Sequence, residues 1–428
     1  MTKKYGFNTR ALHAGAVIDE TKARGVPLHR TSSYVFNSTS HAADLFALKE
    51  PGNMYTRMMN PTQGVLEERM AALEGGDAAL ALASGTAAIF YAVINICGHG
   101  DEVVSANNLY GGTHTMFDSI LPELGIKTKF EDPLDPDNLE KVINDSTKML
   151  FTEVIGNPVL DVANIRTISE IAHRHHIPLV VDSTFTTPYL FRPLEHGADV
   201  VIHSLTKWLG GHGTGIGGIV VDGGKFDWTD RKFRLYNEPD PSYHGLRYAH
   251  DLGDLNPLAF ITRMRLVPLR NLGACISPDN AWMFLQGIET LPLRMQRHCD
   301  NAMAAAQYLT DHPAVKWVRY PGLKQDPAYE TASRQFENGF GGMVVFGIKG
   351  GRTAGETFIN NLGLISHLAN VGDAKSLAIH PASTTHSQLS EDQQREGGIT
   401  PDLIRLSVGI ESIEDIHADL GQALSSIR

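Results

Sequence analysis

Residues 178–207 read PLVVDSTFTTPYLFRPLEHGADVVIHSLTK. This segment contains two short apolar strands, LVVD and DVVIHS, separated by a stretch that is long enough for a short helix. Two strands joined in this way run parallel in one sheet. Asp182 ends the first strand and Lys207 follows the second. We therefore expect both side chains at the carboxyl edge of the sheet, where open α/β folds bind ligands.

Other short apolar segments alternate with helical patterns in the same way. They are ALALAS (79–84), DEVVSA (101–106), KMLFTEV (148–154) and GGIVVDG (217–223). The alternation predicts an α/β protein whose mostly parallel sheet is covered by helices on both faces.

The length of 428 residues exceeds what one hydrophobic core supports. After Pro313 the segments VKWVRYPG, GGMVVFGIKG and LIRLSVGIE indicate a smaller α/β unit, and residues 226–277 fit no clear pattern. We expect three parts: an N-terminal arm (1–60) that contacts a neighbouring subunit, a large domain (61–285) that binds the cofactor, and a C-terminal small domain (286–428).

Composition narrows the class of function. The formal net charge is −11 and the chain has no Lys/Arg-rich tract, which argues against nucleic acid and anionic membranes as partners. Its three cysteines, Cys97, Cys275 and Cys299, are too few and too scattered for a disulfide framework. The N-terminus has no apolar signal region. These features predict a cytoplasmic protein that acts on small molecules.

Lys207 is the strongest candidate for chemistry. It follows a buried strand and precedes a glycine-rich turn in DVVIHSLTKWLGGHGTGIGG (199–218). An amine that leaves bulk water beside other cations has a lowered pKa and becomes a nucleophile toward an aldehyde. Taken alone, the same position suits a lysine that extends from a strand end to solvent. Asp182 at the same edge favours the catalytic interpretation, because a buried aspartate needs a cationic partner such as a pyridinium nitrogen.

The segment ALALASGTAAIFYAV has the features of a phosphate site. A strand leads through Ser84, Gly85 and Thr86 into an apolar helix, whose free N–H groups and dipole favour a dianion. Ser204 and Thr206 offer hydroxyl donors from the other side. A plain helix N-cap explains the same residues and is compatible with the phosphate site. An aldehyde, a pyridinium nitrogen and a phosphate together are the groups of pyridoxal 5′-phosphate (PLP).

Three more residues follow strands or lie within one. Tyr110, in NNLYGGT, suits stacking on a flat ring and proton transfer, or a place in the core. The amide of Asn157, in EVIGNP, comes after a strand end where it can reach the phenolic oxygen of the cofactor. Arg405 interrupts the apolar strand LIRLSVGIE, so it binds either a substrate carboxylate or an internal acid.

Two other motifs are set aside, and we predict no metal site. Residues 213–218 match the dinucleotide pattern G-x-G-x-x-G but precede a strand instead of following one. His173, His175 and His176 end a helical segment, where cationic side chains favour the helix dipole.

Taken together, the sequence resembles the Cys/Met-metabolism PLP-dependent enzymes from about Phe7 to the C-terminus. The motifs that carry the resemblance are YTRMMNPT, ASGTAA, LYGGT, GNP, VDSTF, HSLTKWLGGH, HPASTTH and LIRLSVGIE. The resemblance implies fold type I of the PLP-dependent transferases, in which the large domain contains a mostly parallel sheet of seven strands.

The resemblance also implies a role for individual residues. Lys207 is the Schiff-base lysine, Asp182 the pyridinium partner and Tyr110 the stacking residue and proton carrier. The phosphate is bound by Gly85, Thr86, Ser204 and Thr206. Substrate is bound by Arg405, Ser366 and Tyr55, and the cofactor also contacts Asn157. Tyr55 and Arg57 reach the phosphate in the neighbouring subunit, which implies a homotetramer built as a dimer of dimers with shared active sites.

Within the family, residues 364–389 resemble those of O-acetylhomoserine sulfhydrylases, which make homocysteine and acetate from O-acetylhomoserine and sulfide, or methionine when methanethiol replaces sulfide. Methionine lyases typically have Cys where this chain has Gly112. Cystathionine γ-synthase and O-succinylhomoserine sulfhydrylase remain alternatives, because several chemistries share the fold. A non-catalytic scaffold of the same fold is a further alternative.

Overall fold

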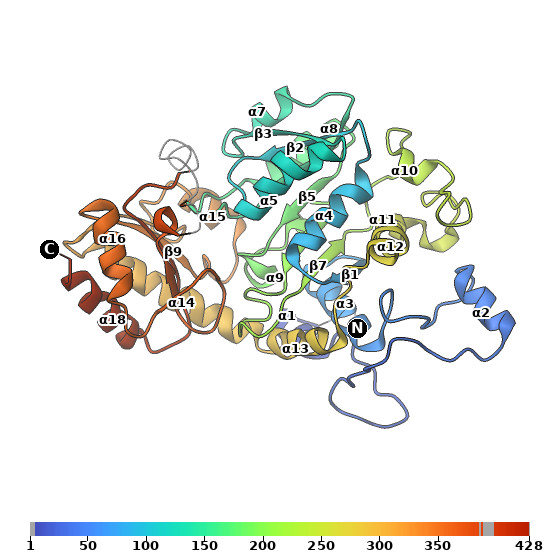
Figure 1. Ribbon diagram of the computed structural model, residues 1–428, viewed down its shortest axis with the longest axis horizontal. Helices are drawn as coiled ribbons and strands as arrows, with labels where there is room; N and C mark the ends of the chain where they lie inside the picture. The colour runs from blue at the N-terminus through green and yellow to red at the C-terminus, as the bar shows by residue number, and fades with distance from the viewer. Residues whose placement is uncertain (1–4, 385–386, 388–397, 428) are drawn as a thin grey trace.

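A seven-stranded sheet forms the centre of the larger part of the molecule, and a five-stranded sheet forms the smaller part (Figure 1). The computed structural model describes residues 5–384, 387 and 398–427. The strand order of the large sheet is β1-β7-β6-β5-β4-β2-β3. Its strands are β1 (Ala78–Leu82), β2 (Glu102–Ala106), β3 (Lys127–Glu131), β4 (Thr147–Glu153), β5 (Leu179–Asp182), β6 (Val200–Ser204) and β7 (Gly218–Asp222).

The sheet is parallel except at β7, which runs antiparallel to both of its neighbours, β1 and β6. All six apolar segments named from the sequence form strands, so the prediction of a mostly parallel sheet is confirmed. The strand β3 was not predicted, because its sequence KTKFE is only partly buried and carries two lysines.

Alternate residues of the strands face two different cores, as strand geometry requires. One core contains Val181 and Val201, and the other contains Val180 and Ile202. The helices that contribute buried residues to the first core include α3 (Pro61–Glu74), α8 (Ile165–Arg174), α9 (Thr187–Leu190) and α13 (Pro278–Glu289). Those that contribute to the second include α4 (Gly85–Ile96), η1 (Met116–Ile120), α6 (Leu121–Glu123) and α11 (Ala259–Met264). The sheet is therefore covered on both faces.

The unassigned segment 226–277 is built from short helices and packs on the α4 side. Its aromatic residues Trp228, Tyr236 and Phe260 are buried, and the Trp228 ring stacks on those of Tyr236 and Phe260. Besides α11, its helices are α10 (Arg234–Asn237), η3 (Gly253–Leu258), η4 (Arg265–Leu269) and α12 (Arg270–Leu272). Such short turns have no sustained hydrophobic period, which is why the sequence pattern missed them.

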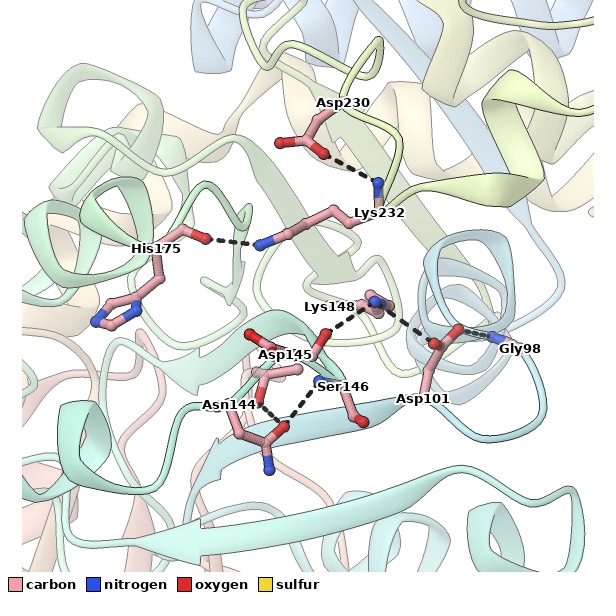
Figure 2. A network of polar contacts seen from close by, with 10 residues as sticks. Gly98, Asp101, Asn144, Asp145, Ser146, Lys148, His175, Asp230 and Lys232 are labelled. Atoms are coloured by element: carbon pink, nitrogen blue, oxygen red, sulfur yellow. Dashed lines mark hydrogen bonds and ion pairs between the residues drawn. The ribbon is translucent and has the colours of Figure 1, made fainter.

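A network of polar contacts lies at the amino edge of the large sheet (Figure 2). The Lys148 Nζ atom donates to the carbonyl of Asp145 at 3.1 Å and lies 3.8 Å from the Asp101 carboxylate. Lys232, from the segment 226–277, donates to the carbonyl of His175 at 2.8 Å. The Lys232 contact attaches that segment to the edge opposite the one at which β5 and β6 end.

The smaller sheet has the strand order β10-β11-β12-β9-β8. Its strands are β8 (Val315–Arg319), β9 (Met343–Ile348), β10 (Ser366–His367), β11 (Leu377–Ile379) and β12 (Leu403–Ser407). The helices in this part are α14 (Leu291–Thr310), α15 (Tyr329–Gln335), α16 (Gly351–Asn360), η5 (Pro381–Ser383) and α18 (Ile413–Ser425). The three predicted strands correspond to β8, β9 and β12, whereas β10 and β11 are too short to give a pattern.

The helical segment after residue 278 consists of two helices, since α13 ends at Glu289 and α14 begins at Leu291, with Pro292 in its first turn. α13 packs against α3, which covers the large sheet, and α14 packs against the strands β8 and β9 of the small sheet. The pair therefore connects the two sheets, while domain limits at residues 60 and 285 stay a prediction.

The N-terminal region is only partly an extended arm. Residues 7–13 form α1 (Phe7–His13), which packs against α3 and α13, so this part belongs to the body of the chain. By contrast, α2 (Thr39–Phe46) stands away from the large sheet at the lower right of Figure 1. The remaining helices are α5 (Gly111–Thr115), α7 (Pro136–Lys141) and η2 (Pro193–His196). In the part of the chain that the structure describes, no helix is long and apolar enough to cross a bilayer.

Candidate active site

The candidate site lies at the carboxyl edge of the large sheet, where β4, β5 and β6 end beside one another. Glu153, at the end of β4, is paired in register with Asp182 at the end of β5. The residues two positions earlier in each of these strands belong to the core on the α4 side. Since side chains two positions apart share a face, Glu153, Asp182 and Ser204 also face α4.

Lys207 lies in the turn that follows β6. Its backbone N–H donates to the carbonyl of Ser204, and its own carbonyl accepts from Gly211, which has a φ of 70°. The Nζ atom donates to Oδ1 of Asn370 at 2.6 Å. Burial lowers the pKa of Lys207 to about 8, and the nearby charge of Arg405 acts in the same direction. The lowered pKa agrees with the sequence argument for an activated amine, while the catalytic role of Lys207 stays a prediction.

Arg405 projects from β12 of the small sheet toward the edge of the large one. Its Nη1 atom donates to Oδ1 of Asn157 at 3.1 Å, and its charge acts on Lys207. Burial lowers the pKa of Arg405 to about 10. No acidic side chain forms an ion pair with Arg405 within the described ranges, so the internal salt bridge considered above is absent there. The buried guanidinium is free to bind a carboxylate.

Asp182 is also without an ion-pair partner among the residues that the structure describes. Its Oδ1 atom accepts the backbone N–H of Thr184 at 2.9 Å. Burial raises the pKa of Asp182, whereas the contact with Thr184 and the charge of His203 oppose that rise. A cationic ring nitrogen at this position would stabilise the carboxylate.

The phosphate region is formed where α4 begins against the end of β6. The Ser84 Oγ atom accepts the backbone N–H of Ala87 at 3.0 Å, so the helix N-cap is present. A Cβ atom on Gly85 would lie 2.8 Å from Cβ of Ser204, which shows that only glycine fits this close approach. Thr86 lies in the first turn of α4, and the Thr206 hydroxyl accepts the N–H of Gly217 at 3.1 Å. Gly85, Thr86, Ser204 and Thr206 are thus grouped as expected.

Tyr110 is held at the start of α5 by its main chain. Its backbone N–H donates to Oε1 of Glu153 at 2.7 Å, while its side chain is about half exposed. A Cβ atom on Gly112 would lie 2.7 Å from Cε1 of the Tyr110 ring. A side chain at position 112, such as the Cys of methionine lyases, would displace this ring from its present position.

Three predicted residues are not joined to this group by any contact within the described chain. Ser366 is exposed on the edge strand β10, and its backbone N–H donates to the carbonyl of Ser376. Tyr55 forms a bridge with Ser33, and the Arg57 guanidinium lies 5.1 Å from the centre of the Tyr55 ring. Both contacts lie within the arm.

Two residues of the site were not predicted, Asn370 and Glu153. Asn370 lies in the loop between β10 and β11, within the stretch 364–389, whose resemblance to the family implied no role for it. Glu153 ends β4 as Asp182 ends β5. Its position at a strand end was a signal that could have been used.

The arrangement fits PLP at each of its functional groups. A buried amine of lowered pKa could condense with the aldehyde, and a buried acid without a cationic partner would suit the ring nitrogen. The close approach at Gly85 would leave the backbone N–H groups at the start of α4 for the phosphate. Fold and site together define a PLP-dependent enzyme of fold type I.

Comparison with known proteins identifies the family. The family model described as Cys/Met metabolism PLP-dependent enzyme matches residues 8–425, so the chain belongs to that family. The expected family, cofactor and fold type are therefore confirmed. The role of each site residue stays a prediction.

Individual relatives match over nearly the full length. The chain is 53% identical to O-acetyl-L-homoserine sulfhydrylase of Leptospira meyeri, with 100% of this chain and 98% of the relative covered. It is 49% identical to homocysteine synthase of Schizosaccharomyces pombe, with 98% of each covered. A crystal structure of a candidate O-acetylhomoserine (thiol)-lyase from Campylobacter jejuni, which carries N′-pyridoxyl-lysine-5′-monophosphate, superposes with a TM-score of 0.94 at 41% identity and covers 98% of this chain and 100% of that one.

Proposed function

We propose that the chain replaces the γ-substituent of O-acetylhomoserine with sulfide and releases homocysteine and acetate. The observation that carries this proposal is the pair of buried cations, Lys207 and Arg405, which lie close together without an acidic partner in the described residues. A substrate with an α-carboxylate beside its reacting carbon matches this pair. Relatives named O-acetyl-L-homoserine sulfhydrylase, at 53%, 48% and 45% identity, support the choice of substrate.

The residues of the chain bind and orient the substrate. Arg405 binds the α-carboxylate with two parallel hydrogen bonds, while Asn157 fixes the guanidinium through its Oδ1 atom. Asp182 keeps a negative charge beside the ring nitrogen of the cofactor. When bound, PLP supplies the electron sink for the negative charge that forms at Cα.

Proton transfer at Cα is assigned to Lys207. With a pKa of about 8, its free amine is neutral in about one molecule in ten at pH 7, which is enough for general base catalysis. Asn370 accepts one N–H of this amine, so the amine is held in place while its lone pair stays available. The Tyr110 hydroxyl carries protons near Cγ, where acetate leaves and sulfide adds.

A product assay tests the reaction. Purified protein is supplied with O-acetylhomoserine and sulfide, and in parallel with O-succinylhomoserine, with cysteine in place of sulfide, or with methanethiol. We expect homocysteine and acetate, with kcat/KM at least about tenfold higher for the acetyl ester than for the succinyl ester. Faster formation of cystathionine from cysteine, or a preference for the succinyl ester, would instead establish one of the sibling activities.

We also propose that the enzyme is a homotetramer, built as a dimer of dimers, in which Tyr55 and Arg57 complete the neighbouring subunit's site. The arm exposes apolar side chains in the single chain, with Val35 97% and Val17 82% exposed, and burial of such residues favours association. Arg57 has no ion-pair partner within the described residues, which leaves its charge for a phosphate. The three cysteines are free and fit the reducing cytoplasm, where we place the enzyme.

Mixing two inactive variants tests the shared site. We expect Arg57→Ala and Lys207→Ala to be nearly inactive alone and to regain about a quarter of wild-type activity when unfolded, mixed in equal amounts and refolded, because half of the dimers then contain one intact site. If each chain completes its own site, the mixed dimers contain two damaged sites and stay inactive. A mixture of wild type and Lys207→Ala serves as the control for refolding.

A further inference from the structure

Glu153 is a second carboxyl group in the site, and the chemistry above gives it no role. It ends β4 directly opposite Asp182, and both side chains face α4. Adjacent strands lie about 4.8 Å apart, so the two carboxyl groups are close neighbours. Glu153 is only 6% exposed. The protonation state of a buried acid at this position therefore affects the net charge of the site.

The groups around Glu153 do not neutralise a negative charge on it. Its Oε1 atom accepts the backbone N–H of Tyr110 at 2.7 Å, and no cation forms an ion pair with it in the described part of the chain. His203 lies on the opposite face of the sheet, where its Nε2 atom is 2.5 Å from Glu74. The two cations of the site, Lys207 and Arg405, make their hydrogen bonds to amide groups.

The two carboxyl groups differ in what stabilises their charged forms. Burial raises the pKa of Glu153 well above its usual range, and the negative charge of Asp182 raises it further, whereas the hydrogen bond from the Tyr110 N–H acts in the other direction. Burial also raises the pKa of Asp182, but the hydrogen bonds from Thr184 and the charge of His203 act in the other direction. Two acids that share a site do not both ionise readily, and here Asp182 is the one whose anion is better stabilised.

We propose that Glu153 is kept as a neutral carboxylic acid and is a positioning residue, which holds Tyr110 through its backbone while Asp182 alone carries the negative charge beside the ring nitrogen. The inference rests on the proposed cofactor roles of Asp182 and Tyr110. It assigns two chemically similar side chains on neighbouring strands to different protonation states. Asp182 is needed for its negative charge, and Glu153 is needed for the oxygen atom that accepts the Tyr110 N–H.

Isosteric substitutions distinguish these states. Glu153→Gln and Asp182→Asn each replace an acid with an amide of the same shape, on adjacent strands and on the same face. Glu153→Leu keeps apolar bulk but removes the acceptor for the Tyr110 N–H. For each holoenzyme we would measure the dissociation constant of PLP and the pH midpoint of the Schiff-base absorption band.

We expect Glu153→Gln to bind PLP within about twofold of wild type and to keep the pH midpoint, because its amide oxygen replaces the acceptor without a change in charge. Asp182→Asn should weaken PLP binding about a hundredfold and shift the midpoint. Glu153→Leu should weaken PLP binding about tenfold, because the Tyr110 N–H loses its partner.

Two results would overturn the inference. If Glu153→Gln shifts the pH midpoint by a unit or more, or weakens PLP binding as strongly as Asp182→Asn does, then Glu153 is ionised. If Glu153→Leu binds PLP as wild type does, then Glu153 does not position Tyr110. Neither measurement requires O-acetylhomoserine, so failure of the product assay would sink the proposed reaction and leave this inference standing.

Discussion

Lys207→Ala should remove the visible Schiff-base absorption band of the purified protein and lower kcat by about 10⁴-fold or more. The variant loses the amine that condenses with the cofactor aldehyde and the base that removes the Cα proton. Its pKa of about 8 makes this lysine a much better base near neutral pH than an exposed lysine. Absorption spectra and product formation from O-acetylhomoserine and sulfide measure the two losses separately.

Lys127→Ala is the matched control, because Lys127 is an exposed lysine at the start of β3, on the same sheet but away from the carboxyl edge. It should keep both the absorption band and the turnover. Borohydride reduction of the wild-type holoenzyme, followed by peptide mass spectrometry, should place the cofactor on Lys207. A Lys207→Ala protein that retained the band and its turnover would refute the assignment on which the proposed reaction depends.

Arg405→Ala should lower kcat/KM for O-acetylhomoserine by about 10²-fold, mainly through a higher KM. The substitution removes the only cation that we assign to the substrate carboxylate. Arg405→Lys should recover only part of the loss, because an ammonium group does not form the paired hydrogen bonds of a guanidinium. Steady-state kinetics over a range of substrate concentrations separate the two constants, and an unchanged KM would contradict this role.

The same substitution should also change the pH profile. The charge of Arg405 lowers the pKa of Lys207, so its removal should raise that pKa. Because the neutral amine is the base, the acidic limb of the kcat profile should move to higher pH. If the profile keeps its wild-type position, Arg405 and Lys207 do not interact in the enzyme–substrate complex.

The amino-acid sequence is sufficient to predict the large sheet and its functional edge. Strand periodicity identifies six of its strands, and the positions of Asp182 and Lys207 at strand ends place both residues on one edge. Gly85 is also recognisable, because a glycine between a strand and an apolar helix indicates a close approach of the backbone to a ligand.

The rest depends on contacts that no local pattern encodes. Asn370 touches Lys207 across 163 residues of sequence, and Arg405 touches Asn157 across 248. Pairs so far apart are brought together only by the docking of the two sheets. The helix α1 was missed for a related reason, since seven residues give too short a pattern and its stability comes from packing against α3 and α13.

The hydrogen bonds of Lys207 with Asn370 and of Arg405 with Asn157 each cross from one sheet to the other, so the distance between the base and the residue that binds the carboxylate is set by how the two sheets meet. Residues far from the substrate can therefore change the rate of the reaction. A substitution where the two sheets meet, including one at the α13–α14 junction, changes that distance without altering a catalytic group. A displacement of about 1 Å lowers the rate by about 10²-fold. New substrate preferences in such an enzyme can arise from residues that no substrate ever contacts.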